Sequence, residues 1–484
     1  MVSVSGPTDP RISVIGTGYL GTTHAVCMAE LGFEVVGVDV DAERVRRLAA
    51  GEVPFFEPGL EALLRKHLEA GRLSFTGSPA AAVDQADVHF VCVGTPQRPD
   101  SGAADVRHVD AAVSGLVTAG LGPGDLVVGK STVPAGTASR LAARLAAAAP
   151  GAELAWNPEF LREGIAVDDT LHPDRIVLGV APGGTAEARL RAVYARMTDA
   201  GTPVIVTDYA TAELVKVAAN AFLATKISFV NAMAEVCDAT GADVAELAAA
   251  LGHDPRIGPR FLRAGIGFGG GCLPKDIRAF QARARELGVG PALGFLAEVD
   301  AVNMRARDRA VALAHEVLGG QPANRAVGVL GAAFKPNSDD IRDSPALDVA
   351  VALRRAGCHV SVYDPAAAAN AQDRHPDLHV AGSVMGAVTG AELLLVLTEW
   401  PEFRELDPAL IRPHVTRPVV LDGRGALDAR RWQEAGWAYH ALGRPARGPL
   451  VPRERPPSGG DLHEGTGLDL VNEAADRGRG LQER

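Results

Sequence analysis

The first forty residues contain the pattern that most restricts the fold of this chain. A short β-branched run, Arg11–Gly16, leads into Gly16-Thr-Gly-Tyr-Leu-Gly21, a helical stretch to about Leu31, and a second strand-like run, Phe33–Val38, that ends at Asp39. A strand, GxGxxG, a helix, a strand and a late acid form the dinucleotide-binding fingerprint of a βαβ unit. The sequence therefore predicts a doubly wound α/β domain that holds a dinucleotide.

The fingerprint also supplies the first candidate binding residues. The helix N-terminus receives the pyrophosphate, and the acid at the end of the second strand binds the ribose hydroxyls. A carboxylate at Asp39 repels the extra phosphate of NADP, so we expect NAD, although the nearby cation of Arg44 argues the other way. The candidate cofactor residues here are Gly16, Gly18, Tyr19, Leu20, Gly21, Asp39 and Arg44.

The α/β alternation occurs twice along the chain, with a helical region between. Strand-like runs recur at Val88–Gly94, Leu126–Gly129, Arg175–Val180, Ala326–Leu330, His359–Tyr363, Leu393–Leu397 and Val419–Leu421. The region from Tyr209 to Leu251 and a second stretch from Leu293 to Leu318 are helical in pattern. We expect two Rossmann-like doubly wound parallel domains joined by a long helical connector, with boundaries at 1–208, 209–320 and 321–443. The Pro-, Gly- and charge-rich composition of residues 444–484 predicts a disordered tail.

Two proline-containing loops follow strand-like runs of the first domain. Thr95-Pro96 and Ser131-Thr-Val-Pro134 lie just past the ends of their strands. Ligands of such sheets bind outside the carboxyl ends of the strands, so both loops are expected to face the cofactor or the substrate. The alternative is that both are ordinary connecting loops.

The segment from Gly267 to Asp276 carries the strongest chemical signal. It reads Gly-Phe-Gly-Gly-Gly-Cys-Leu-Pro-Lys-Asp, so Cys272 is followed closely by Lys275 and Asp276. The glycines allow a close approach to the backbone, and a cation near a thiol lowers its pKa and raises the thiolate fraction. The segment predicts a nucleophilic cysteine. The alternative is a glycine-rich turn with Cys272 as a small buried residue.

Two polar residues share a face of the predicted connector helix. Lys216 and Asn220 are four residues apart, and the residues that flank them are apolar. An unpaired buried lysine is costly, so we expect Lys216 to have a partner or a chemical role. A solvated helix face is the alternative.

The bulk composition excludes several classes of function. The net charge of −11 is spread along the chain without a basic cluster, which argues against a nucleic-acid partner. No apolar run approaches about 18 residues, so no membrane span is expected and the protein should be cytoplasmic. Five scattered cysteines without CxxC spacing argue against a disulfide framework or a metal site.

Together these motifs resemble those of the nucleotide-sugar dehydrogenases, the UDP-glucose and GDP-mannose dehydrogenase family, from about Arg11 to Gly443. The family's three parts, a cofactor domain, a helical dimerisation region and a nucleotide-sugar domain, match the division above. One departure is Gly271, where many relatives have serine before the cysteine. Besides the fingerprint and the cysteine segment, the resemblance rests on Glu57-Pro-Gly-Leu60, Val93-Gly-Thr-Pro96, Ser131-Thr-Val-Pro134, Asn157-Pro-Glu-Phe-Leu-Arg-Glu163, Lys216 to Asn231, Phe334-Lys335 and Asp422-Gly-Arg424.

The resemblance implies a four-electron oxidation of a sugar C6 alcohol to a carboxylate, with two NAD used in succession. UDP-glucose is the implied substrate, and GDP-mannose or another nucleotide sugar is the alternative. The cysteine would form first a thiohemiacetal and then a thioester, which water cleaves. The implied catalytic residues are Cys272, Lys216, Asn220, Asp276, Glu159 and Thr132.

Family roles can be assigned to the individual catalytic residues. Asp276, through water, or Lys216 removes the hydroxyl proton, and Lys216 with Asn220 stabilises the oxyanion. Glu159 assists thioester hydrolysis, and Thr132 holds the water network.

Binding residues are implied in the same way. Arg256 resembles an arginine that relatives donate to the neighbouring subunit, which implies a homodimer. The further cofactor residues are Thr95, Thr132, Lys275 and Arg342. The substrate-binding residues are Glu159, Phe160, Leu161, Arg162, Lys216, Asn220, Arg256, Phe268, Gly269, Phe334, Lys335 and Arg424.

Two other functions compete with this interpretation. An NAD-dependent β-hydroxyacid dehydrogenase shares the fold and a Lys-x-x-x-Asn helix, but it needs neither Cys272 nor a third domain. An inactive nucleotide-sugar sensor would keep the fold without needing the whole set of catalytic residues.

Overall fold

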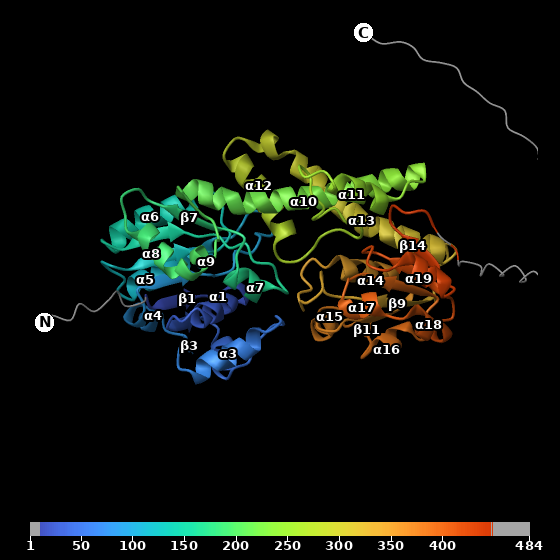
Figure 1. Cartoon of the computed structure of the whole chain (residues 1–484), viewed down its shortest axis with the longest axis horizontal. Coiled ribbons are helices and arrows are strands. Elements are labelled where there is room, and N and C mark those ends of the chain that lie inside the picture. Colours follow the sequence, from blue (N-terminus) through green and yellow to red (C-terminus); the bar gives the residue numbers. More distant parts are fainter. Residues whose placement is uncertain (1–9, 447, 449–484) are drawn as a thin grey trace, which may run out of the picture.

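A long helix connects two separate β-sheets. The computed structural model describes residues 10–446 and 448 of the 484-residue chain. One sheet lies at each end of the molecule, and α10 (Tyr209–Thr240) extends across both (Figure 1). The predicted α/β fold with two doubly wound domains and a helical connector is confirmed. The predicted disorder of the tail falls almost entirely outside the described residues.

The first sheet has eight strands in the order β3-β2-β1-β4-β5-β6-β7-β8. Its strands are β1 (Ile12–Ile15), β2 (Val35–Val38), β3 (Leu73–Thr76), β4 (Val88–Val91), β5 (Leu126–Gly129), β6 (Glu153–Trp156), β7 (Ile176–Val180) and β8 (Val204–Thr207). Its helices are α1 (Tyr19–Glu30), α2 (Ala42–Ala49), α3 (Leu60–Glu69), α4 (Pro79–Gln85), α5 (Arg107–Thr118), α6 (Thr137–Ala148), α7 (Ala166–Leu171), α8 (Ala186–Val193) and α9 (Ala195–Asp199).

One pairing in this sheet differs from the prediction of an all-parallel sheet. Strand β7 runs antiparallel to β6, with Ala155 opposite Val180. A parallel return needs a crossover, usually a helix that packs on the sheet. The connection 157–175 contains only the six-residue α7, which packs against α1, so β7 returns in the opposite direction.

The second sheet has six parallel strands in the order β11-β10-β9-β12-β13-β14. Its strands are β9 (Ala326–Leu330), β10 (His359–Tyr363), β11 (His379–Val380), β12 (Leu393–Val396), β13 (Val419–Asp422) and β14 (Ala438–Ala441). The helical segments around it are α14 (Pro345–Arg355), α15 (Ala368–Arg374), α16 (Val384–Val388), α17 (Pro401–Glu405), α18 (Pro408–Ile411), the 3-10 turn η2 (Arg412–His414) and α19 (Ala429–Glu434).

The connector contains several helices. The predicted helical region from Tyr209 to Leu251 is two helices, because Gly241 adopts φ +75° and ends α10. The remaining elements are α11 (Val244–Gly252), α12 (Leu273–Glu286), the 3-10 turn η1 (Gly290–Leu293) and α13 (Phe295–Val317).

Helix α10 is the one helix in the described part of the chain that is long and apolar enough to cross a membrane. It packs against α12 and α13, and it buries the polar residues Glu213, Lys216 and Asn220 among its apolar ones. These contacts bury one face of the helix, which joins the two halves.

Candidate active site

Two of the predicted catalytic residues lie on the buried face of α10 and contact residues from other elements. The amine of Lys216 is 3.0 Å from Oε1 of Glu159, which lies in the loop after β6. The amide of Asn220 donates to Oδ2 of Asp276 on α12 at 2.7 Å. The i, i+4 spacing therefore places an ammonium and an amide at one site, and the solvated-face alternative does not apply.

The surroundings of Lys216 favour the charged form of its amine. Burial acts to lower the pKa of Lys216, but the negative groups around it, led by the carboxylate of Glu159, together outweigh burial and leave that pKa raised. Cys272 and Asp276 act in the same direction as Glu159. Lys216 is therefore a cation in the free protein, close to both the thiol and the two carboxylates.

Cys272 immediately precedes α12 and is partly open to solvent. The protein atoms packed around its thiol raise its pKa to about 12, Glu159 adds to this, and Lys216 opposes it. The sequence predicted a lowered pKa, and that prediction is wrong for the free protein. The adjacent cation is not available, because the amine of Lys275 binds Oδ1 of Asp276 at 2.6 Å.

The glycines before Cys272 accommodate other parts of the protein. A Cβ on Gly270, which adopts φ +83°, would lie 2.7 Å from the ring of Phe334. A Cβ on Gly269 would collide with the backbone of Asp343, and one on Gly271 with the guanidinium of Arg342. The close approach predicted from the glycines is therefore made, at these positions, by the loop after β9.

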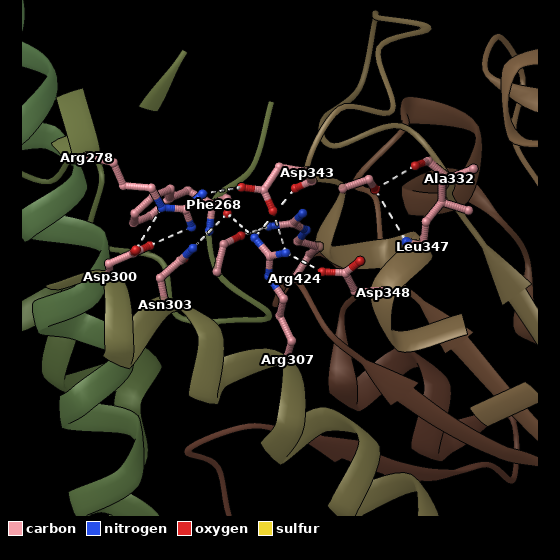
Figure 2. Close-up of polar contacts among 12 residues, drawn as sticks. Phe268, Arg278, Asp300, Asn303, Arg307, Ala332, Asp343, Leu347, Asp348 and Arg424 are labelled. Carbon is pink, nitrogen blue, oxygen red and sulfur yellow. Dashed lines mark hydrogen bonds and ion pairs between the residues drawn. The ribbon is translucent and has the colours of Figure 1, made fainter. Parts of the chain in front are cut away.

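Polar side chains from α13 and from the loop after β13 hold the same segment (Figure 2). Asn303 accepts from the Phe268 amide at 2.7 Å and donates to its carbonyl at 3.0 Å. The buried Arg307 also donates to the Phe268 carbonyl, at 2.9 Å, and pairs with Asp343 at 2.7 Å. Arg424 donates to the carbonyls of Gly267, Leu397 and Phe334 at 2.6, 2.8 and 3.0 Å. The cysteine segment is thus fixed from two sides.

The residues of the fingerprint fit a dinucleotide. Gly16 adopts φ +89°, and a Cβ on Gly18 would meet no protein atom within 4 Å, which leaves space beside the N-terminus of α1. No side chain caps that N-terminus. These features match the requirements of a pyrophosphate site.

The carboxylate of Asp39 lies at the end of β2, where ribose hydroxyls are expected. It already accepts from the Thr17 amide at 2.7 Å and the Asp41 amide at 3.0 Å. Arg44 donates to both of its oxygens at 3.1 Å. Burial opposes the charge, but these hydrogen bonds leave the pKa of Asp39 lowered. The arginine that complicated the prediction of NAD therefore pairs directly with the acid.

Other predicted cofactor residues are held by the protein itself. The hydroxyl of Tyr19 donates to the buried Glu57, which also accepts from the Gly164 amide at 2.6 Å. The hydroxyl of Thr95 donates to the Thr132 carbonyl at 2.8 Å, so the two proline-containing loops are joined. Thr132, Lys275 and Asp276 also line one cavity of about 300 Å³ between α10 and α12. Leu20 lies in the helix beside Tyr19 and lines a smaller cavity.

The predicted substrate residues gather in two groups. The Phe160 ring lies under the Arg175 guanidinium at 3.9 Å and near the amine of Lys216 at 5.6 Å. Its neighbour Leu161 lines the smaller cavity, and Arg162 pairs with Asp169 at 2.6 Å.

The second group comes from the loop after β9. Burial lowers the pKa of Lys335, which lies close enough to Glu163 and Cys272 for their charges to act on it. The same loop carries Arg342, a predicted cofactor residue, which pairs with Asp340 at 2.6 Å and with Glu163 at 3.3 Å. Arg256 lies apart from this group: it is 87% exposed and pairs with Asp254 of its own loop.

Sequence reasoning missed several residues of the site. Glu163 faces the second half of the chain, and burial together with Asp340 raises its pKa to about 7. Asn303 and Arg307 were also missed. They are a polar pair four residues apart on a partly apolar helix, and the same signal identified Lys216 and Asn220. In the described part of the chain no group of three or more His, Cys, Asp or Glu is arranged to hold a metal ion.

Comparison with family models matches nearly the whole described chain. Three models of the UDP-glucose/GDP-mannose dehydrogenase family match: the NAD binding domain at residues 10–198, the central domain at 210–305 and the UDP binding domain at 328–429.

Several individual proteins are similar over most of their length. The chain is 42% identical to UDP-glucose 6-dehydrogenase of Pseudomonas aeruginosa, covering 90% of this chain and 98% of that protein. It is 39% identical to UDP-glucose 6-dehydrogenase TuaD of Bacillus subtilis, covering 90% and 94%. A solved UDP-glucose dehydrogenase from Pyrobaculum islandicum superimposes with a TM-score of 0.81 at 40% identity, covering 91% of this chain and 99% of that one.

Proposed function

The chain belongs to the UDP-glucose/GDP-mannose dehydrogenase family, and we propose that it oxidises the C6 alcohol of UDP-glucose to a carboxylate with NAD. The observation that carries this proposal is the grouping of Cys272 with Lys216, Glu159 and Asp276, which come from three separate elements. A simple alcohol dehydrogenase has no use for a cysteine at this point. The identity of the proposed substrate is based on the similarity to UDP-glucose 6-dehydrogenases.

The first oxidation needs a group that accepts the C6 hydroxyl proton. NAD, when bound, accepts one hydride in each of the two oxidations. Lys216 already carries a proton in the free protein, so it suits an oxygen that develops negative charge. The carboxylate of Asp276 is oriented by Asn220 and Lys275, one on each oxygen, and we assign it the role of base through water.

The second oxidation uses the cysteine. Sγ of Cys272 bonds to the aldehyde carbon while the thiol proton passes to solvent water, which reaches the partly exposed cysteine. The carbon–oxygen π bond breaks, and Lys216 and Asn220 stabilise the resulting oxyanion. Loss of the second hydride leaves a thioester. A water oxygen then bonds to that carbon while its proton passes to Glu159. The carbon–sulfur bond breaks, and the sulfur keeps the electron pair.

The stoichiometry of NADH tests this chemistry. The intact protein should release two NADH for each UDP-glucose consumed, and Cys272→Ser should release one at most. A ratio of one in the intact protein would contradict the proposal. The same assay with GDP-mannose and UDP-N-acetylmannosamine decides the substrate, and a higher kcat/KM for either would exclude UDP-glucose as the preferred one.

We propose that three units of the chain divide this work. Residues 1–208 hold NAD, residues 209–320 mediate dimerisation and residues 321–443 bind the UDP-sugar. The described sheets and connector, together with the descriptions of the three family models, support this division.

A homodimer is supported by one face of α10. Phe222, Phe229 and Val236 repeat every seven residues along it and are 65%, 48% and 52% exposed. Residues at this spacing lie on one side of a helix, and a second copy of the chain would cover them. The loop that carries Arg256 is attached to the same helix, because Lys226 donates to the Ile257 carbonyl at 2.9 Å.

Mixing two inactive variants tests whether the site is shared. Arg256→Ala and Cys272→Ala chains are each expected to be inactive alone. Heterodimers of the two should regain activity if Arg256 serves the neighbouring chain. No recovery, with heterodimers demonstrated by two different affinity tags, would contradict donation across the interface.

A further inference from the structure

Lys130 is a buried lysine to which the proposed chemistry gives no role. It is 7% exposed, follows β5 directly, and precedes the loop that contains Thr132. Its amine donates to Oδ1 of Asn157 at 2.9 Å and lies 5.8 and 6.0 Å from the rings of Phe90 and Tyr194. Burying an ammonium without a directly paired carboxylate is costly. The free-energy cost of burying Lys130 indicates that this residue has a function.

The position of Lys130 connects it to Glu159 in two ways. Asn157 begins the loop that carries Glu159, so the Lys130 hydrogen bond joins the loops after the neighbouring strands β5 and β6. Lys130 and Glu159 also line the same cavity of about 60 Å³. The carboxylate charge of Glu159 acts on Lys130, and so does the charge of Lys216.

This cavity has the polar character that water requires. His24 lines it and is 1% exposed, and its Nε2 atom has no hydrogen-bond partner among the described residues. Oε2 of Glu159 is buried and equally without a partner there. A volume of this size accommodates about two water molecules, and buried polar atoms of this kind are normally satisfied by water.

We propose that Lys130 is a positioning residue that keeps Glu159 charged and oriented toward water in this cavity during thioester hydrolysis. This rests on the function proposed for Glu159. The second cation is needed because Lys216, the direct partner of Glu159, is also the cation assigned to the substrate oxygen. When Lys216 turns to that oxygen, Lys130 remains to support the carboxylate from the other side.

The charge and the hydrogen bond of Lys130 can be tested separately. Lys130→Met removes both, Lys130→Arg keeps the charge, and Tyr194→Phe removes only the other donor to Asn157 Oδ1, at 2.5 Å. The thioester on Cys272 is followed by rapid acid quench and intact-protein mass spectrometry from pH 5.5 to 9. The titratable groups that face Lys130 and Glu159 are Cys92, His24, Lys216 and Cys272. Burial raises the pKa of both thiols to about 12 and lowers the pKa of His24, and the pKa of Lys216 is raised, so all four pKa values are shifted away from this range.

Lys130→Met should accumulate thioester and move the acidic limb of the hydrolysis profile up by about one pH unit, so that hydrolysis is up to about tenfold slower at pH values on that limb. Lys130→Arg and Tyr194→Phe should keep that limb in place. An unmoved limb in Lys130→Met, or an equal shift in Tyr194→Phe, would overturn the proposal. The release of the first NADH by the intact protein is measured alongside, and its absence would count against the proposed function instead.

The intact protein offers an independent test that needs no loss of the lysine. Burial lowers the pKa of Lys130 to about 8. Thioester hydrolysis should therefore slow as the pH rises through about 8, where Lys130 loses its charge, and Lys130→Arg should abolish this decline because arginine stays protonated. The same decline in both proteins would refute the role of the charge.

Discussion

Gly270 provides a quantitative test of how closely the cysteine segment packs on the second half of the molecule. Its φ of +83° is in the left-handed region, and a Cβ there would lie 2.7 Å from the Phe334 ring. Gly288, after α12, has nearly the same φ of +76° but no protein atom within 4 Å of such a Cβ. Gly288→Ala therefore measures the backbone strain alone, and Gly270→Ala measures the strain plus the collision.

The two contributions can be estimated separately. The strain costs about 1–2 kcal/mol in either variant. Carbon atoms pack best at about 3.5–4.0 Å, so the Phe334 ring must move by roughly 1 Å, and overpacking of this kind costs about 1–3 kcal/mol more. A displacement of that size beside the reacting atoms also lowers kcat/KM by up to about 10²-fold.

Thermal unfolding and steady-state kinetics of both variants decide the outcome. We expect Gly288→Ala to be slightly less stable than the parent and fully active. Gly270→Ala should be less stable than Gly288→Ala by the cost of the collision and should lose activity. If the two variants are equally stable and Gly270→Ala keeps its kcat/KM, the close packing described here is wrong.

Three further predictions follow from the site. Lys216→Met leaves the carboxylate of Glu159 buried without its directly paired cation and should lower the free energy of unfolding by about 3–5 kcal/mol. The double variant Lys216→Met/Glu159→Gln should recover part of this loss. If the losses of the two single variants simply add in urea unfolding, the pairing is contradicted. A pKa of about 12 makes the thiolate of Cys272 scarce at neutral pH, so its alkylation by iodoacetamide should accelerate about tenfold per pH unit from pH 7 to 10, and a plateau by pH 9 would refute this. Arg44→Ala removes the cation on Asp39 and should strengthen the preference for NAD, whereas an unchanged NAD-to-NADP rate ratio would show that Arg44 is neutral in this choice.

The parts of the fold that were predictable are those with a local sequence signal. The fingerprint strand before Gly16 and the strand Leu393–Val396 of the second sheet are buried throughout, and both consist mainly of aliphatic residues. Strands such as Leu73–Thr76 and Val204–Thr207 were missed because they are half-exposed. The reversal at β7 depends on where α7 packs, which no local pattern encodes.

The site shows the same division between local and long-range information. Lys216 and Asn220 were identified because four-residue spacing on an apolar helix is visible in the sequence. The thiol pKa of Cys272 was predicted in the wrong direction, because burial by other parts of the chain raises it, and because Lys275, three residues further along, binds Asp276 instead. The purpose of the glycines was also out of reach, since the Phe334 ring that fills the space beside Gly270 comes from another domain.

The length of α10 restricts how this chain can change by insertion or deletion. Its 32 residues span about 48 Å, with Glu213 bound to the Gly136 amide at 2.7 Å near one end and Asn231 bound to the Gly265 amide at 2.9 Å farther along. Removing one residue between these two contacts would rotate the rest of the helix by about 100° and separate Asn231 from its loop. Length changes of α10 between Glu213 and Asn231 are therefore not tolerated.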